Sequence, residues 1–104
     1  MKVKKIIGIT ACITGIAHTY LASEALIEAG KSLNIKVKIE THGAIGIENK
    51  LTQKDIDEAI GVIIASDIVV NDHRFINKKI IKVVTQEAIK HPKKLILSLI
   101  EEKD

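Results

Sequence analysis

A chain of 104 residues, of which 46% are hydrophobic, is long enough for one domain with a single aliphatic core and too short for two. One tyrosine, one phenylalanine and no tryptophan offer almost no aromatic surface for stacking on bases, so we expect no nucleic-acid partner. The net charge of +3 comes from lysines scattered along the chain, which indicates a solvated surface. The single cysteine cannot form an internal disulfide, and no apolar stretch reaches membrane-spanning length. We therefore expect one cytosolic domain over 1–104, without membrane insertion.

The first half of the chain alternates between strand and helix patterns. Residues 4–9 form a short apolar run, which predicts a buried strand. From His18 to Leu33 apolar residues recur at helical spacing, which predicts an amphipathic helix. Residues 35–41 then alternate apolar and polar side chains, so we expect a strand at the edge of the sheet with one face in water.

The middle of the chain predicts a loop, a short helix and a central strand. Residues 41–46 are interpreted as a glycine-containing loop. Thr52, followed three residues later by Asp55, has the form of a capping box that opens a helix through Ala59. Residues 60–65 are apolar without a break, which is typical of a central strand in a parallel sheet.

The last third is expected to add one strand and two helical segments. Residues 66–79 are polar and are predicted as mostly loop with one helical turn. Residues 80–84 form a fourth strand, and the helix that begins at Thr85 is interrupted or restarted by Pro92, because proline suits the first turn of a helix.

These elements predict an α/β fold. We expect a single-domain three-layer sandwich with a four-stranded parallel sheet of order 2-1-3-4 and helices on both faces. In such sheets ligands bind at the carboxyl ends of the strands where the winding reverses, here between the first and third strands. Cys12 lies at that point.

Cys12 is therefore a candidate nucleophile. A helix N-terminus stabilises a thiolate, which is the reactive form of cysteine. On composition alone, a lone cytosolic cysteine is more often a small buried hydrophobe. The neighbouring residues favour the nucleophile instead. A phosphate-binding loop provides hydroxyl groups and a close approach of the backbone, and these are supplied here by Thr14, Thr19 and Gly15.

The spacing of Cys12 and His18 is informative in itself. Cys-x5-His-Thr has the spacing of the Cys-x5-Arg-(Ser/Thr) loop of cysteine phosphatases, with histidine in place of arginine. Arginine binds a phosphoryl group through bidentate hydrogen bonds and always carries charge, whereas histidine at a helix start tends toward the neutral form. A weaker grip favours passing the group on over hydrolysing it. Alternatively, His18 simply bonds within its own turn.

Other polar residues are expected at the same end of the sheet. His42, Asp67 and Arg74 are interpreted as a possible partner surface, although each could also be an ordinary solvated loop residue. The latter interpretation is favoured for Asp72 and His73. One thiol and four widely separated histidines have no zinc-ligand spacing, so we expect no metal and no cofactor.

Three segments together resemble one known family. Residues 10–19, 37–46 and 65–67 are similar to the fructose-type enzyme IIB of the bacterial phosphoenolpyruvate-dependent sugar phosphotransferase system (PTS). Nine of the ten positions of that family's motif T-A-C-P-T-G-x-A-H-T are met. Two letters differ, because Ile13 replaces the proline after the cysteine and Ala44 replaces a common serine.

The resemblance implies a fold and a function. The family has a four-stranded parallel sheet flanked by helices. Its cysteine accepts a phosphoryl group from a phosphohistidine on enzyme IIA and passes it to the sugar carried by the membrane component, enzyme IIC. The resemblance implies that Cys12 is the phosphocysteine, that the domain is cytoplasmic and bound to the membrane through enzyme IIC, and that the phosphate loop comprises Ile13, Thr14, Gly15, Ile16, Ala17, His18 and Thr19.

Two alternatives remain open from the sequence. A small cysteine phosphatase would need Asp67 or Asp72 as the acid that protonates the leaving group. A non-catalytic regulatory domain would keep the fold without turnover.

Overall fold

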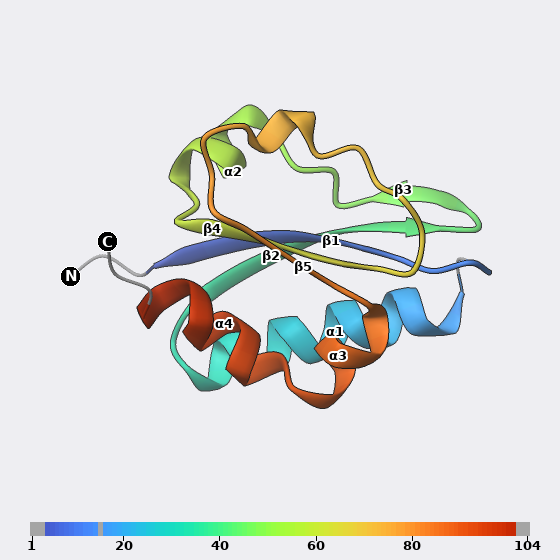
Figure 1. Ribbon diagram of the computed structural model, residues 1–104, viewed down its shortest axis with the longest axis horizontal. Coiled ribbons are helices and arrows are strands. Elements are labelled where there is room, and N and C mark those ends of the chain that lie inside the picture. The colour runs from blue at the N-terminus through green and yellow to red at the C-terminus, as the bar shows by residue number, and fades with distance from the viewer. Residues whose placement is uncertain (1–3, 15, 102–104) are drawn as a thin grey trace.

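The computed structural model describes residues 4–14 and 16–101. A twisted sheet forms the middle of three layers (Figure 1). The helices α1 (Ala17–Ser32), α3 (Thr85–Lys90) and α4 (Pro92–Glu101) cover one face of this sheet, and α2 (Gln53–Glu58) with a short 3₁₀ turn covers the other. This arrangement confirms the predicted three-layer α/β architecture. Within the described ranges, no helix is long and apolar enough to cross a lipid bilayer.

The sheet has the order β3-β2-β1-β4-β5. Its parallel strands are β1 (Lys5–Ala11), β2 (Lys36–Gly43), β4 (Gly61–Ser66) and β5 (Ile80–Val83). β1 pairs with both β2 and β4, and every residue of β1 is buried, as its apolar run predicts. The order 2-1-3-4 predicted for four parallel strands is therefore confirmed.

A fifth strand was not predicted. β3 (Gly46–Glu48) runs antiparallel to the end of β2, where the sequence predicts only a loop over 41–46. Gly46 has φ of 120°, a conformation that favours glycine, and it pairs with Gly43 across the turn. All three residues of β3 are exposed, so no burial pattern marks the strand in the sequence. The prediction that β2 is an edge strand is consequently wrong over Thr41–Gly43, which β3 covers.

The helices follow local signals closely. α1 (Ala17–Ser32) is the predicted amphipathic helix, and α2 (Gln53–Glu58) starts with the predicted capping box. In that box the amide of Asp55 donates to the Thr52 hydroxyl at 3.1 Å, and the Thr52 amide donates to the Asp55 carboxylate at 2.8 Å. Both predictions are confirmed, because each depends on residues that lie within one or two helical turns of one another.

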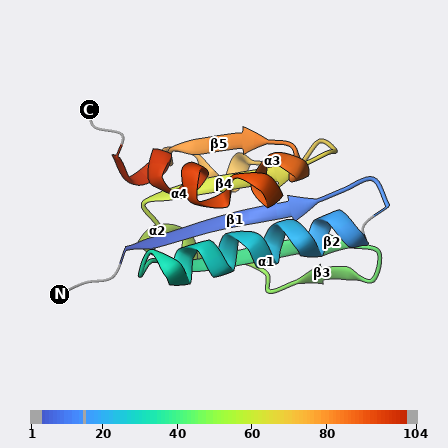
Figure 2. The same cartoon turned by 90° about the horizontal axis from the view of Figure 1, so that it is seen from below.

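The C-terminal segment also agrees with prediction. One 3₁₀ turn, η1 (His73–Phe75), interrupts the long connection between β4 and β5. α3 (Thr85–Lys90) ends two residues before Pro92, the first residue of α4 (Pro92–Glu101). Figure 2 shows α1 lying over β1 and β2, while α3 and α4 lie beside it over β4.

The core consists of two clusters, one on each face of the sheet. The cluster under α1, α3 and α4 is built mainly from Ile6, Leu26, Ile39, Ile63, Leu95, Ile96 and Leu99. The cluster under α2 and η1 is built from Ile7, Ile9, Leu51, Ile56, Val62, Ile64 and Phe75. Because the four long strands are parallel, their carboxyl ends share one end of the domain, and the residues after β1, β2 and β4 meet there.

Candidate active site

Cys12 directly follows β1, and only 5% of its surface is exposed. The Thr19 hydroxyl donates a hydrogen bond to Sγ at 3.1 Å, and the Thr14 hydroxyl lies 3.6 Å from Sγ. The backbone amides of Ile16 and Thr19 also hydrogen-bond the sulfur. Ile16 caps α1 without any side-chain hydrogen bond, so the first amides of the helix remain available for an anion. The sulfur therefore lies among donors contributed by its own loop and by α1.

These donors decide the charge of the thiol. Burial alone would raise the pKa of Cys12, because it disfavours the thiolate. The hydroxyls of Thr19 and Thr14 and the amides of Thr19 and Ile16 stabilise the thiolate more strongly, and the pKa falls from 9.0 to about 6. The thiolate is then the favoured form of Cys12 at pH 7. The surroundings of Cys12 therefore favour the thiolate despite its burial.

The remaining residues of the predicted phosphate loop divide into two groups. The side chains of Ile13 and Ile16 are exposed, at 82% and 60%, and of these two residues only Ile16 acts on the sulfur, through its backbone amide. Ala17 and His18 are also exposed, and no contact of the described residues joins the His18 ring to Sγ. The predicted loop residue Gly15 lies outside the described residues. Thr14, Ile16 and Thr19 are thus the loop residues that contact the sulfur in this structure.

Asp67 is committed to a structural contact. Its carboxylate accepts hydrogen bonds from the Thr85 amide at 2.9 Å and the Thr85 hydroxyl at 2.8 Å, and its own amide donates to the Ala11 carbonyl at 3.0 Å. Asp67 therefore ties the end of β4 to β1 and to the start of α3. Both carboxylate oxygens are occupied, which leaves the side chain poorly placed to protonate a leaving group.

Asp72 is unsuited to that role for a different reason. Lys82 forms an ion pair with it at 2.6 Å, and this contact holds the pKa of Asp72 below its usual value. A general acid must carry a proton at working pH. Each of the two aspartates that could serve a phosphatase as the acid is therefore engaged by another residue.

Glu40, near the carboxyl end of β2, is buried, contrary to the prediction from the sequence. The alternation of residues 35–41 predicts that Glu40 faces water, yet it is 1% exposed. The connection between β4 and β5 crosses over β2 and buries it, because Phe75 enters the core beside Arg74. No short-range pattern in the sequence signals this burial.

Glu40 links two of the predicted partner-surface residues. Arg74 donates to both carboxylate oxygens, at 3.1 Å and 2.9 Å, and His42 contacts Oε2 through Nε2 at 2.5 Å. The Leu51 amide donates to Oε1 at 2.8 Å. Burial alone would raise the pKa of Glu40, but the bonds from Arg74, His42 and Leu51 outweigh it and lower the pKa from 4.5 to about 2. His42 and Arg74 are therefore brought together by Glu40, a residue that the sequence did not single out.

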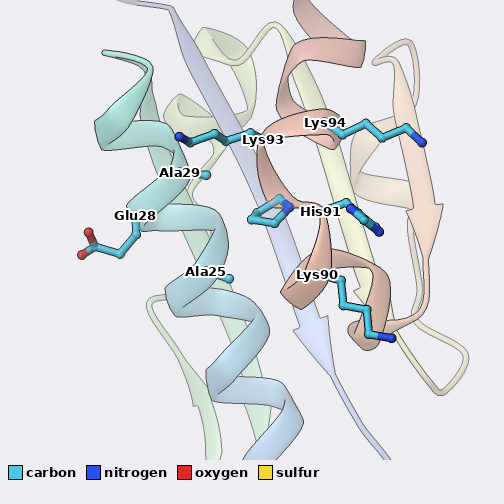
Figure 3. A pocket seen from close by; sticks show the side chains of 8 residues that line it. Ala25, Glu28, Ala29, Lys90, His91, Lys93 and Lys94 are labelled. Atoms are coloured by element: carbon cyan, nitrogen blue, oxygen red, sulfur yellow. The ribbon is translucent and has the colours of Figure 1, made fainter.

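A cavity of about 450 Å³ lies elsewhere, between α1 and the junction of α3 with α4. Figure 3 shows Ala25 and Ala29 facing it and Lys93 extending toward α1, while Lys90 and Lys94 point to the other side. Ala25 is six residues beyond Thr19, about 9 Å along the helix from the contact with Cys12. This cavity lacks convergent polar groups, so the candidate active site is the Cys12 end of the sheet.

The fold and the site together define a small α/β domain in which a buried cysteine lies between the end of the central strand β1 and the N-terminus of α1. The family model for "PTS system, Lactose/Cellobiose specific IIB subunit" matches residues 7–98. The chain therefore belongs to the IIB family of the PTS, whose members are phosphotransferase components. The resemblance stated from the sequence is thereby confirmed at the level of the family.

Individual relatives carry fructose-type names. The chain is 47% identical over 87 residues to the "PTS system fructose-like EIIB component 2" of Escherichia coli K12, covering 83% of this chain and 82% of that protein. It is 44% identical over 92 residues to the "PTS system fructose-specific EIIABC component" of Bacillus subtilis. That alignment covers 88% of this chain and only 14% of the relative.

Solved structures agree with this assignment. A domain of a fructose-specific IIABC component from Borrelia burgdorferi superposes with a TM-score of 0.93 at 37% identity, covering 98% of both chains. The enzyme IIB subunit of the PTS from Escherichia coli K12 superposes with a TM-score of 0.87 at 40% identity, covering 96% of this chain and 94% of that one. The fold and the family thus rest on agreement over nearly the whole chain.

Proposed function

We propose that residues 1–104 form a phosphocysteine carrier domain in which Cys12 accepts a phosphoryl group from a phosphohistidine on enzyme IIA. The thiolate attacks phosphorus, an S–P bond forms, the N–P bond breaks, and its electron pair returns to the imidazole. The observation that carries this proposal is the set of donors around Sγ, which keeps the nucleophile ionised.

The second step passes the group to the sugar. A sugar hydroxyl attacks phosphorus, the S–P bond breaks, and the thiolate leaves with the electron pair. A thiol of low pKa is the better leaving group, so the contacts that favour attack also favour release. The proton of the sugar hydroxyl goes to a base on the membrane partner, enzyme IIC. Phosphoryl transfer depends mainly on positioning and electrostatics, which the loop amides, Thr14 and Thr19 provide.

The partners follow from the relatives. The Bacillus subtilis relative carries A, B and C components in one protein, which supports enzyme IIA as the donor and enzyme IIC as the acceptor site. A fructose-type sugar is supported by the names of the relatives. We place the domain in the cytoplasm, bound to the membrane through enzyme IIC.

An exposed apolar rim around Cys12 supports contact with protein partners. Most of the large hydrophobic side chains that remain exposed lie at the carboxyl end of the sheet: Ile13, Ile16, Ile45, Ile47, Ile68 and Val69. Apolar groups gathered at one end of a domain are typical of an interaction surface. In this proposal, the rim contacts enzyme IIA and enzyme IIC in turn.

The test is direct transfer. Incubation with phosphorylated enzyme IIA is expected to give a phosphoprotein that is stable to acid and labile to iodine, as a thiophosphate should be. Cys12→Ala is expected to abolish labelling, and His91→Ala, which changes an exposed residue between α3 and α4, serves as the matched control. Circular dichroism of each variant checks folding. Labelling that persists in Cys12→Ala would overturn the proposal.

The structure disfavours both alternatives on specific grounds. For a phosphatase, neither proposed acid is available, because Asp67 is bound to Thr85 and Asp72 to Lys82. A domain without chemistry would not need four donors on a buried sulfur, and its thiol would titrate near the ordinary value. Steady hydrolysis of an aryl phosphate in the absence of partners would favour the phosphatase over the carrier.

A further inference from the structure

A second pocket lies at the carboxyl end of β2, on the face of the sheet that carries α2. Its volume is about 280 Å³. The hairpin of β2 and β3 forms one wall with His42, Ile47 and the following Lys50, and the connection after β4 forms the other with Asn71, His73 and Arg74. None of these residues contacts Cys12, whose sulfur is bound to α1 on the opposite face. The pocket thus shares no residue with the set of donors around Sγ.

The floor of this pocket is a carboxylate with no remaining capacity. Glu40 accepts four hydrogen bonds, two of them from Arg74, and a carboxylate has about four acceptor sites. Its charge is balanced by Arg74 at 2.9 Å. Glu40 therefore does not compete for the other donors of the pocket, and its main effect is to hold Arg74 and His42 in place.

Arg74 is fixed in an orientation that leaves part of it free. Its guanidinium binds both oxygens of Glu40 and lies 5.1 Å from the centre of the Phe75 ring. Its side chain is still 34% exposed, and a guanidinium has five N–H groups, of which Glu40 takes two. The outer edge of Arg74 can therefore bind another oxyanion without any rearrangement.

Two further donors surround this edge. Asn71 accepts the His73 amide through its side-chain oxygen at 2.9 Å, which leaves the NH₂ group of Asn71 to donate. Lys50 is exposed, and among the described residues no carboxylate pairs with its ammonium group. A planar guanidinium, an amide and an ammonium group thus line one pocket, with the ring of His73 at its rim.

We propose that this pocket is a second oxyanion site, which binds the phosphate group of a small phosphorylated molecule without covalent chemistry. A phosphate ester presents several acceptor oxygens in different directions and matches three donors that come from two separate segments. The volume lies just below the usual range for small-molecule sites, which suits an ester no larger than a hexose phosphate. The site stands whether or not Cys12 carries phosphoryl groups.

The experiment is a ¹⁵N NMR titration of the full chain at constant ionic strength, with inorganic phosphate in one arm and a hexose phosphate in the other. We expect saturable shifts of the amides of Ile47, Asn71, His73 and Arg74. Equal affinity in the two arms would identify free phosphate as sufficient, and tighter binding of the hexose phosphate would identify the ester as the ligand. Either result supports the site.

Variants make the test specific. Lys50→Gln and His73→Gln alter exposed side chains of the pocket, and Lys50→Gln is expected to weaken binding about 10-fold or more, as the loss of a charged hydrogen bond does. Lys54→Gln changes an exposed lysine on α2 outside the pocket and is the matched control. The proposal is overturned if the shifts do not saturate, if they are confined to residues 12–19, or if Lys50→Gln weakens binding no more than Lys54→Gln does.

Discussion

The hydroxyl of Thr19, in the first turn of α1, donates a 3.1 Å hydrogen bond to Sγ of Cys12 at the end of β1. Thr19 is completely buried, so no water can replace this donor when it is removed. Each element supplies one partner, and the contact exists only when α1 is seated on the sheet. The reactivity of the thiol is therefore coupled to the packing of the fold.

The wild-type thiol should show a low pKa directly. The rate of alkylation by iodoacetamide tracks the thiolate fraction, so we expect a half-maximal rate at about pH 6. The same measurement in denaturant should give a midpoint close to that of an ordinary free thiol, because the donors around Sγ are then dispersed. A midpoint above pH 8 in the folded protein would contradict the role assigned to these donors.

Thr19→Val should raise the pKa of Cys12. The substitution keeps the shape of the side chain and removes the donor, and hydrogen bonds to charged groups contribute about 1.5–3 kcal/mol, so we expect an increase of about one unit or more. The alkylation profile measures it. Thr41→Val is the matched control, because Thr41 is also buried and its hydroxyl has no hydrogen-bond partner. Equal shifts in the two variants would argue against a specific contact.

Thr41→Val should also leave stability unchanged or increase it. A buried hydroxyl without a partner loses its hydration on folding and gains nothing in return, and this cost is about 1–3 kcal/mol. Thr10 pairs with Thr41 in the sheet and has the same defect, so Thr10→Val should behave alike. Urea denaturation provides the free energy of unfolding. A loss above about 1 kcal/mol would show that these hydroxyls do have partners.

Breaking the ion pair of Glu40 and Arg74 should be costly. Arg74→Met leaves a buried carboxylate without its cation, and we expect a loss of about 3–5 kcal/mol in urea denaturation. The double variant Glu40→Met with Arg74→Met should be less destabilised than Arg74→Met alone, because no buried charge remains. A double variant as unstable as the sum of the two single variants would mean that the pair does not interact.

Glu40 also predicts a pH dependence of stability. Its pKa is lower in the folded chain, at about 2, than the ordinary value of 4.5, so the folded state favours the ionised form. This contribution is complete above pH 4.5 and is lost as the pH falls toward 2. We expect Glu40→Gln to have a lower free energy of unfolding than wild type at pH 7. This difference should shrink as the pH falls from 4.5 to about 2, and urea denaturation at a series of pH values measures it. A difference that does not change with pH would contradict the assignment.

Local patterns in the sequence determined most of the framework. The buried run of β1, the helical spacing of α1, the capping box of Thr52 with Asp55 and the restart at Pro92 each depend on residues close in the chain, and each was found where predicted. The order of the four parallel strands followed from which runs were most apolar. Cys12 was likewise identified by its neighbours, since a strand, a loop and a helix start adjoin it.

Tertiary structure decided what those residues contact. Glu40 stands in an alternating strand and looks solvated, but a connection more than 30 residues later covers it and supplies Arg74. Asp67 looks like a free loop carboxylate, yet Thr85 occupies it only because β4 and β5 are neighbours. β3 has no buried residue, so only its pairing with β2 defines it. Sequence patterns report burial and spacing within a segment, whereas the partner of a charged side chain depends on how distant segments cross.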